Sequence, residues 1–248
     1  MYKYKLTLAY DGTNYSGWQV QPHATSIQEI LEKAIHTITR EQVRLIGSGR
    51  TDAGVHAMGQ VAHCVFEKPI DLEMFFKAMN GILPYDIRLL DIVLAPLDFH
   101  AQKSARRKVY HYHLCLQPVV LPFQRLYTSH VREPLCLDLM LRAAQCFVGT
   151  HNFTSFANSA SEGAAAKNAE RTLYRLDLIK TEQGLRLEFE GNGFLYKMVR
   201  NIVGMLLEVG GKKRALDDIS RLFTAKDRRL APKAAPARGL FLMEVCYE

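Results

Sequence analysis

Stretches with the two-residue period of a β-strand and stretches with the helical period of about 3.6 residues alternate along this chain, without the strict strand–helix–strand order of a parallel sheet. The clearest strand pattern comes first, where apolar side chains occupy every second position from Tyr2 to Tyr10. Two further alternating runs, 174–178 and 185–189, flank Glu182-Gln183-Gly184 and predict a hairpin. These patterns predict an α+β fold with two similar lobes, each a mainly antiparallel sheet backed by helices.

The other elements follow from the same two periods. Ser26 and Glu29 form a capping box, which marks the start of an amphipathic helix whose apolar stripe runs from Ile27 to Ile38. Further helices are predicted at 71–82, 137–147 and 194–209, and strands at 43–46, 60–66, 87–94, 109–116 and 240–247.

The lobes are divided near Ser104, which gives an N-terminal lobe of residues 1–104 and a C-terminal lobe of residues 105–248. The stretch from Ala157 to Glu170 is rich in alanine and small polar residues. Such a composition predicts a flexible loop within the second lobe.

Composition narrows the class of protein. The 248 residues suffice for two lobes with real cores, and a hydrophobic share of 48% is typical of globular proteins. The 32 basic and 25 acidic residues give a net charge of +7, which favours a polyanionic partner, most often nucleic acid. No apolar run is long enough for a membrane span and the start lacks the form of a signal peptide, so we expect a cytoplasmic protein.

The cysteines argue against a disulfide scaffold, because the five are scattered and form no Cys-x-x-Cys pair. His111, His113 and Cys115 alternate on one face of a predicted strand, as ligands of a metal could. No second pair of ligands follows at a usable spacing, so the sequence does not favour zinc.

The segment Gly47–His56 is the most informative for chemistry. Its glycines permit a tight, exposed bend that carries Arg50 and Asp52. The Gly-x-Gly start does not fit a phosphate-binding loop or a dinucleotide fingerprint, because the Lys-Ser/Thr pair and the third glycine are missing at the required spacing. From the residues alone, Asp52 fits a catalytic carboxylate and a turn residue that bonds its own backbone about equally well.

Several motifs together resemble the tRNA pseudouridine synthase A family. The signature is Gly49-Arg50-Thr51-Asp52-Ala53-Gly54-Val55-His56, followed by Gly59-Gln60-Val61. The other matching segments occur in family order over nearly the whole chain, at 11–19, 83–88, 99–101, 108–112, 151–156 and 193–200.

The resemblance implies an isomerase that converts uridine to pseudouridine in the anticodon stem-loop of tRNA, at positions 38–40. It implies that Asp52 is the catalytic aspartate and that Arg50 helps to hold the displaced nucleotide. It further implies that Tyr110 stacks on the target base and that Arg200, in the same motif as Leu195, pairs with the aspartate. The family works as a homodimer with each tRNA spanning both subunits, so we expect a homodimer, with the active-site cleft between the two lobes.

The chemistry agrees with these roles. Isomerisation breaks the C–N glycosidic bond, turns the uracil and joins its C5 to the ribose C1′, so it needs no redox cofactor or energy donor, and we expect no metal or organic cofactor. Asp52 could attack C1′, attack the uracil ring or assist elimination, and the sequence leaves these routes open. An arginine partner would favour the charged carboxylate, and an aromatic ring such as Tyr110 suits a base extruded from a stem or loop.

Basic residues flank the predicted site in three runs. A single run is usually a solvated face, whereas three runs around one site favour a phosphate track. The first run, just before the Tyr110 strand, is expected to contact the RNA backbone. The runs are Lys103, Arg106, Arg107 and Lys108; Lys212, Lys213 and Arg214; and Lys226, Arg228, Arg229, Lys233 and Arg238.

The chain departs from the family pattern in three places. Ser48 stands where alanine is frequent, Gln102-Lys103 where Arg-Phe is usual, and 231–236 reads Ala-Pro-Lys-Ala-Ala-Pro in place of Ala-Gly-Pro-Thr-Ala-Pro. Two alternatives remain at this point: a pseudouridine synthase acting on another RNA, because phosphate contacts carry no sequence information, and a tRNA-binding module without catalysis.

Overall fold

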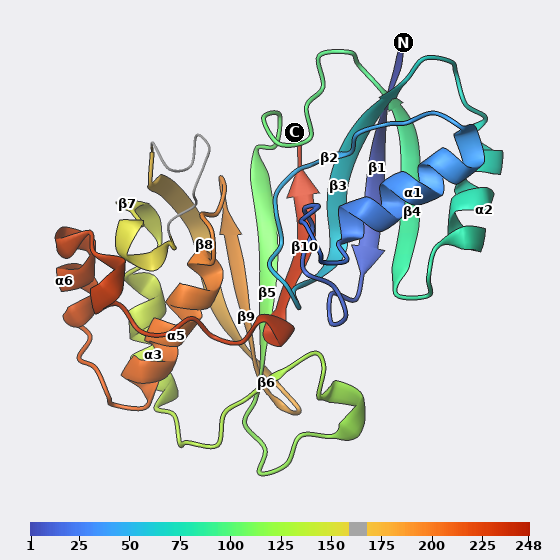
Figure 1. Ribbon diagram of the computed structural model, residues 1–248. Helices are drawn as coiled ribbons and strands as arrows, with labels where there is room; N and C mark the ends of the chain where they lie inside the picture. Colours follow the sequence, from blue (N-terminus) through green and yellow to red (C-terminus); the bar gives the residue numbers. More distant parts are fainter. Residues whose placement is uncertain (159–167) are drawn as a thin grey trace. The chain divides into compact units, whose positions relative to one another are not determined.

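A computed structural model of the protein describes residues 1–158 and 168–248, which form two compact units (Figure 1). The first unit comprises Met1–Arg106 and Phe241–Glu248, and the second comprises Arg107–Leu240. The last residues therefore fold with the first unit. The division into lobes at 1–104 and 105–248 stays a prediction.

The first unit is built on a sheet with the strand order β4-β1-β3-β10. β1 pairs antiparallel with both β3 and β4, whereas β10 runs parallel to β3, and the short β2 is antiparallel to β3. The prediction of a mainly antiparallel sheet is confirmed for this unit. The strands are β1 (Tyr2–Tyr10), β2 (Ile46–Gly47), β3 (His56–Phe66), β4 (Ile87–Ala95) and β10 (Leu240–Cys246).

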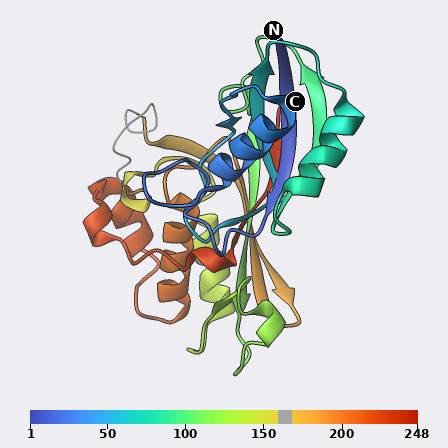
Figure 2. The ribbon, with the colours of Figure 1, turned by 45° about the vertical axis from the view of Figure 1, so that its right-hand side comes forward.

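Two helices, α1 (Ile27–Thr39) and α2 (Leu72–Ile82), lie side by side in the first unit (Figure 2). The capping box is confirmed, because the Ser26 side chain accepts a hydrogen bond from the backbone N–H of Glu29. The alternation in β1 is confirmed as well: Leu6 and Leu8 are fully buried, and α1 contributes Ile27, Leu31 and Ile35 to the core.

The second unit has an antiparallel sheet with the strand order β5-β9-β8-β7, and the short β6 runs parallel to β5. The predicted hairpin is confirmed as β8 and β9, whose register joins Thr181 to Gly184 around a two-residue turn. The strands are β5 (Arg107–Cys115), β6 (Ser129–His130), β7 (Gly149–Asn152), β8 (Glu170–Thr181) and β9 (Gly184–Gly191).

Helices α3 (Leu137–Gln145) and α5 (Met198–Gly210) pack against each other in the second unit, which also contains α6 (Asp218–Ala225). Short 3-10 turns lie at Pro122–Gln124, Thr154–Phe156, Arg228–Leu230 and Ala237–Gly239. Within the described ranges, no helix is long and apolar enough to cross a membrane. Together the two units confirm the predicted α+β class.

Three predicted elements were wrong in extent. The strand predicted at 60–66 begins earlier, at His56. The strand predicted at 43–46 is limited to Ile46–Gly47, because Leu45 bonds to helix side chains instead of a strand: its N–H donates to Glu32 (2.8 Å) and its carbonyl accepts from Gln28 (3.1 Å). The helix predicted at 194–209 begins only at Met198, because Lys197 has the left-handed φ of 60° and ends any helical path from Phe194.

The periodicity of apolar residues in the sequence did not predict β6, β7 or α6. The predicted loop from Ala157 to Glu170 falls mostly on residues 159–167, which lie outside the described residues, and its end at Glu170 is the first residue of β8.

Candidate active site

Residues 48–55, here called the aspartate loop, connect β2 to β3 in the first unit. Asp52 is half-buried and Arg50 is exposed. The backbone N–H of Val55 donates to the carbonyl oxygen of Asp52 at 3.1 Å, and Gly54 has a φ of 75°, which few side chains tolerate. The carboxylate thus sits on a closed turn rather than an extended loop.

The segment 11–19 braces the aspartate loop through its backbone. The N–H of Trp18 donates to the carbonyl of Thr51 (3.0 Å), and the N–H of Gly54 donates to the carbonyl of Tyr15 (3.3 Å). The approach is so close that a Cβ at Gly17 would lie 2.4 Å from the Thr51 carbonyl oxygen. Two motifs that are separate in the sequence therefore form one structural feature.

Buried polar side chains lie beneath the same loop. The hydroxyls of Tyr10 and Thr51 share a hydrogen bond at 2.8 Å. Gln60 donates to the carbonyl oxygen of Gly49 (3.0 Å) and accepts from the hydroxyl of Ser48 (2.8 Å). Burial raises the pKa of Tyr10 to about 12, although its bonds to Thr51 and Gln60 act in the opposite direction, so Tyr10 is a neutral phenol at physiological pH.

His56 fixes the end of the aspartate loop. The ring is 1% exposed, and its Nδ1 accepts a hydrogen bond from the N–H of Gly12 (3.1 Å) and lies 3.0 Å from Oδ1 of Asp11. The ring also stacks on Phe241 of β10, with centroids 4.5 Å apart. The first residue of β3 is thereby tied to both the 11–19 segment and β10.

The motif at 83–88 supports the 11–19 segment from its other side. The N–H of Asp11 donates to the carbonyl of Asp86 at 2.9 Å, and the hydroxyl of Tyr15 donates to the Asp86 carboxylate at 2.6 Å. Burial and this carboxylate raise the pKa of the Tyr15 phenol. Arg88 donates to the carbonyl of Pro84 at 2.7 Å, which holds the 83–88 turn itself.

The motif at 99–101 is anchored in the first unit by Ala101, which is fully buried. The N–H of Ala101 donates to Nδ1 of the buried His63 (3.1 Å), and the hydroxyl of Tyr247 donates to the carbonyl of Ala101 (2.8 Å). Burial, with the charges of His100 and Lys3, lowers the pKa of His63 to about 4. His63 is therefore neutral at physiological pH and serves as an acceptor.

In the second unit, Tyr110 lies on β5 and is 8% exposed, with its ring edge-on to Phe194 at a centroid distance of 5.0 Å. Leu195 follows in the turn before α5 and is buried. The structure thus brings the Tyr110 strand and the 193–200 motif together within one unit.

Arg200 lies in the first turn of α5. Its Nε donates to the carbonyl oxygen of Ala235 at 2.7 Å, so this arginine bonds to the 231–236 stretch through its side chain. Gly204, one turn later, approaches the same stretch so closely that a Cβ would lie 2.2 Å from the Lys233 carbonyl oxygen. The predicted pairing of Arg200 with Asp52 stays a prediction.

A buried polar cluster next to Arg200 was missed in the sequence. Asn201 is fully buried; its amide donates to the carbonyl of Phe156 (2.8 Å) and accepts from Arg228 (2.8 Å). Arg228 also bonds to Asn158 and to the carbonyl of Ala231. An asparagine in a mostly apolar helix was a visible signal for such a cluster, because a buried amide needs partners.

The motif at 151–156 is a core element. Phe153 and Phe156 are fully buried, and the hydroxyl of Ser155 donates to the carbonyl of Leu222 in α6 at 2.6 Å. His151 stacks on Phe223 with centroids 4.6 Å apart. This motif therefore fixes α6 and the residues that lead to Asn158.

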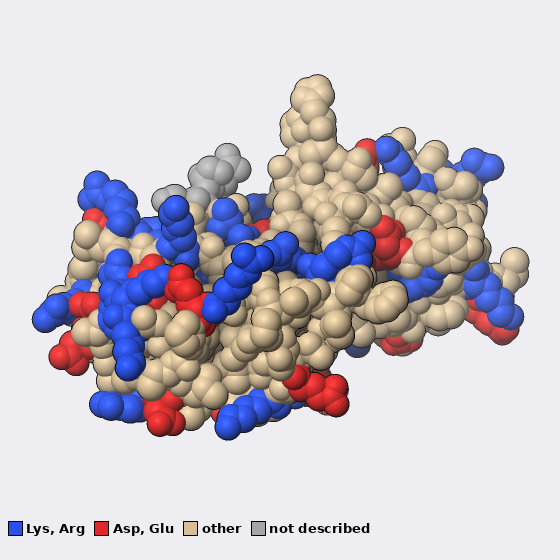
Figure 3. Space-filling model, turned by 90° about the horizontal axis from the view of Figure 1, so that it is seen from below, with Lys and Arg blue, Asp and Glu red and all other residues tan. Residues whose placement is uncertain are grey.

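In the first basic run (Lys103, Arg106, Arg107 and Lys108), two side chains are exposed, one forms an ion pair and one is partly buried. Lys103 and Arg106 are exposed, whereas Arg107 forms an ion pair with Glu190 at 2.8 Å. Lys108 is partly buried, and burial together with the charge of Arg171 lowers its pKa to about 8. On the one face drawn in Figure 3, several Lys and Arg side chains lie next to one another, with Asp and Glu side chains among them.

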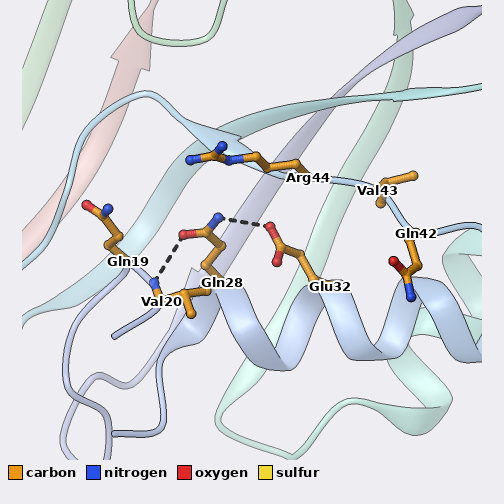
Figure 4. A pocket seen from close by; sticks show the side chains of 7 residues that line it. All are labelled: Gln19, Val20, Gln28, Glu32, Gln42, Val43 and Arg44. Carbon is orange, nitrogen blue, oxygen red and sulfur yellow. Dashed lines mark hydrogen bonds between the residues drawn. The ribbon is translucent and has the colours of Figure 1, made fainter. Parts of the chain in front are cut away.

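A cavity of about 430 Å³ lies between α1 and the segments 19–20 and 42–44 (Figure 4). Gln28 forms its polar wall, accepting from the N–H of Val20 and donating to Glu32. None of the residues predicted for catalysis lines it. Its polar groups hold the approach to β2 against α1, which is a structural role.

Within residues 1–158 and 168–248, no group of three His, Cys, Asp or Glu side chains could hold a metal ion. His111, considered above as a ligand, lies 3.7 Å from the Glu188 carboxylate instead.

The family model described as tRNA pseudouridine synthase matches residues 7–102 and 143–248. The chain is 57% identical over 249 residues to tRNA pseudouridine synthase A 1 of Protochlamydia amoebophila, covering all of this chain and 97% of that protein. It is 48% identical to tRNA pseudouridine synthase A of Chlamydia muridarum (98% and 91% covered) and 46% identical to that of Limosilactobacillus reuteri (100% and 97% covered). The chain therefore belongs to the tRNA pseudouridine synthase family and is an isomerase that acts on uridine in tRNA.

Proposed function

We propose that this protein converts uridine to pseudouridine in the anticodon stem-loop of tRNA, at positions 38–40, with Asp52 as the catalytic carboxylate. The observation that carries the proposal is the support given to Asp52. It is half-buried on a closed turn whose flanking residues bond to the 11–19 segment and to buried polar side chains. A turn residue that merely bonds its own backbone would not require this support.

The proposed roles follow from charge and shape. Arg50 is exposed two residues before Asp52, where its guanidinium can hold a displaced nucleotide through a phosphate. Tyr110 offers an aromatic ring to the extruded uracil, with Phe194 fixing its tilt. Arg200 favours the ionised carboxylate of Asp52 during the reaction, and Leu195, in the same motif, contributes an apolar contact to the substrate.

The proposed partners are tRNA and a second copy of the chain, in the cytoplasm. Lys103, Arg106, Arg107 and Lys108 are proposed to bind phosphates of the RNA backbone. Replacing any one of them by alanine should reduce the salt dependence of tRNA binding by about one unit of slope. Sedimentation equilibrium would test the homodimer, with a mass near that of one chain contradicting it.

The reaction is tested by tritium release from transcripts of tRNA that carry C5-labelled uridine, because joining C5 to C1′ expels the C5 hydrogen. The wild type should release tritium, and Asp52→Ala should release none while still binding tRNA. Asp91→Ala, which removes an exposed carboxylate on β4, is the matched control and should act like the wild type.

The site of modification is tested with transcripts in which the uridines at positions 38–40 are replaced by cytidine. Release should disappear with these transcripts. Release that persists would place the modification elsewhere in the tRNA, and a wild type that binds tRNA without any release would contradict the catalytic proposal.

A further inference from the structure

Three side chains beneath the aspartate loop form a continuous hydrogen-bonded chain. Thr51, which directly precedes Asp52, is 7% exposed, and its hydroxyl bonds to that of Tyr10 at 2.8 Å. Gln60 is fully buried and donates to the Tyr10 hydroxyl (3.4 Å) and to the Gly49 carbonyl (3.0 Å). The chain of bonds therefore reaches the loop backbone on both sides of Arg50 and ends at the residue before Asp52.

The core does not need these polar groups. On the same face of β1, Leu6 and Leu8 are apolar and fully buried, so a phenylalanine at position 10 and a valine at position 51 would bury similar surface. Buried hydroxyl and amide groups lose their bonds to water and add little net stability even when they are paired. What a fully paired buried network adds is a single geometry for the groups that it joins.

We infer that the hydrogen bonds among Tyr10, Thr51 and Gln60 position the Asp52 carboxylate for the reaction, so that these three are positioning residues of the active site. The inference rests on the proposed role of Asp52. Thr51 transmits the effect, because its side chain is held by Tyr10 while its carbonyl oxygen accepts from Trp18 at 3.0 Å. With both sides of Thr51 held, the direction in which the next residue leaves the backbone is defined.

This role has a distinct kinetic signature. A carboxylate displaced by a fraction of an ångström still allows tRNA to bind, because the surfaces that bind the RNA are unchanged. The chemical step is more sensitive, since a misplacement of about 1 Å can cost on the order of 100-fold in rate. The network should therefore affect the single-turnover rate constant and leave the dissociation constant for tRNA unchanged.

Tyr10→Phe and Thr51→Val each remove one hydroxyl and keep the shape of the side chain. The matched control is Tyr4→Phe. Tyr4 lies on the same strand, is 3% exposed, and its hydroxyl accepts a hydrogen bond from the N–H of Ile70 at 3.2 Å, away from the aspartate loop. Thr51→Ser restores a hydroxyl at position 51 and should recover most of the rate.

Wild-type tritium release is measured first, because its absence would refute the proposed function itself. With an active wild type, Tyr10→Phe and Thr51→Val should each lower the single-turnover rate constant by about 10-fold or more. The tRNA dissociation constant should stay within about twofold, and Tyr4→Phe should keep the wild-type rate although it loses the partly buried bond to Ile70. The double variant Tyr10→Phe/Thr51→Val should be no slower than the slower single variant, because both lose the same bond.

Two results would overturn the inference. One is a rate constant within about twofold of wild type in both Tyr10→Phe and Thr51→Val, at unchanged tRNA binding. The other is a rate loss that tracks thermal stability across all variants, including Tyr4→Phe, because that would show a general loosening of the unit. If Tyr10→Phe does not fold, the comparison of Thr51→Val with Thr51→Ser decides alone.

Discussion

Arg200 and Ala235 are joined by two hydrogen bonds: Nε of Arg200 donates to the carbonyl oxygen of Ala235 at 2.7 Å, and the N–H of Ala235 donates to the carbonyl oxygen of Arg200 at 2.9 Å. The first turn of α5 and the 231–236 stretch are thus held together. The departure from the family pattern in this stretch falls at positions 232–234, whereas the alanine at 235 matches the pattern. The departure therefore leaves the support of Arg200 intact.

Arg200→Lys should lower both stability and activity. Lysine keeps the charge but has no planar fork with which to bond Ala235 and also to orient the Asp52 carboxylate, as proposed for Arg200. We expect a loss of about 1 kcal/mol in the free energy of unfolding, measured by urea denaturation, and a clear fall in tritium release. Arg221→Lys on α6, where an exposed arginine pairs with Asp218, is the control and should change stability by less than about 0.5 kcal/mol.

Gly47→Ala should destabilise the first unit by about 1–3 kcal/mol, because a rigid ring stands in the way of the added carbon. A Cβ at Gly47 would lie 2.7 Å from the indole ring of Trp18, which is 3% exposed and has little room to move. Because Trp18 also bonds to Thr51, tritium release should fall as well.

Gly81→Ala is the matched substitution, and it is expected to change the free energy of unfolding in the opposite direction. Gly81 lies in α2, and a Cβ there would meet nothing within 4 Å. Alanine should therefore stabilise the protein by about 0.5–1 kcal/mol, through its better helix propensity. If the urea midpoints of Gly47→Ala and Gly81→Ala moved in the same direction, the predictions for these two glycines would be contradicted.

Stability should decrease as the pH falls from about 6.5 toward 4, in part because of His63. Its pKa is lowered from 6.5 to about 4 in the folded protein, chiefly by burial, so the unfolded chain binds the proton more readily in this range. The contribution is fully present above pH 6.5 and is lost as the pH falls, by on the order of 1–2 kcal/mol after allowance for solvent screening.

His63→Asn should flatten this pH dependence, because asparagine does not titrate and its Oδ1 can accept the N–H of Ala101 in place of Nδ1. Melting temperatures measured from pH 7 to pH 4 would show the flatter pH dependence. The control is His23→Asn, because His23 is exposed and has a positive φ that asparagine tolerates. Equal slopes for the wild type and His63→Asn would refute the assignment to His63.

Asn201→Ala should cost about 2–4 kcal/mol, since it leaves the Arg228 guanidinium and the Phe156 carbonyl without the amide that joins them. The control is Asn192→Ala, where an exposed asparagine accepts from the N–H of Thr172 and the loss should be below about 1 kcal/mol. Similar losses in the two variants would mean that burial of Asn201 adds nothing.

Local patterns predicted most of the secondary structure because burial repeats with the period of each element. The alternation from Tyr2 to Tyr10, the cap at Ser26 and the β8–β9 hairpin all lie within a few neighbouring residues. The start of α5 could not be predicted in this way, because it depends on the left-handed backbone of Lys197. The parallel pairing of β10 with β3 joins distant residues and has no local signal.

The candidate site shows the same limit. The residues around Asp52 fitted a turn as well as a catalytic loop, and only the resemblance to a known family favoured the catalytic interpretation. The sequence predicted Tyr10 only as one more apolar residue of a strand, because its partners Thr51 and Gln60 are 41 and 50 positions away. The support of a site comes from such distant contacts, which periodicity does not contain.

Because β10 belongs to the first unit, this unit can be completed only after the second unit has been translated. A ribosome completes β1, β3 and β4 early, but the strand that covers the other side of β3 becomes available only after the entire second unit has been translated. Until then the start of β3 lacks its β10 partner, and Phe241 cannot stack on His56. The loop that carries Asp52 leads directly into His56, so it gains the support of β10 only when the chain is almost finished.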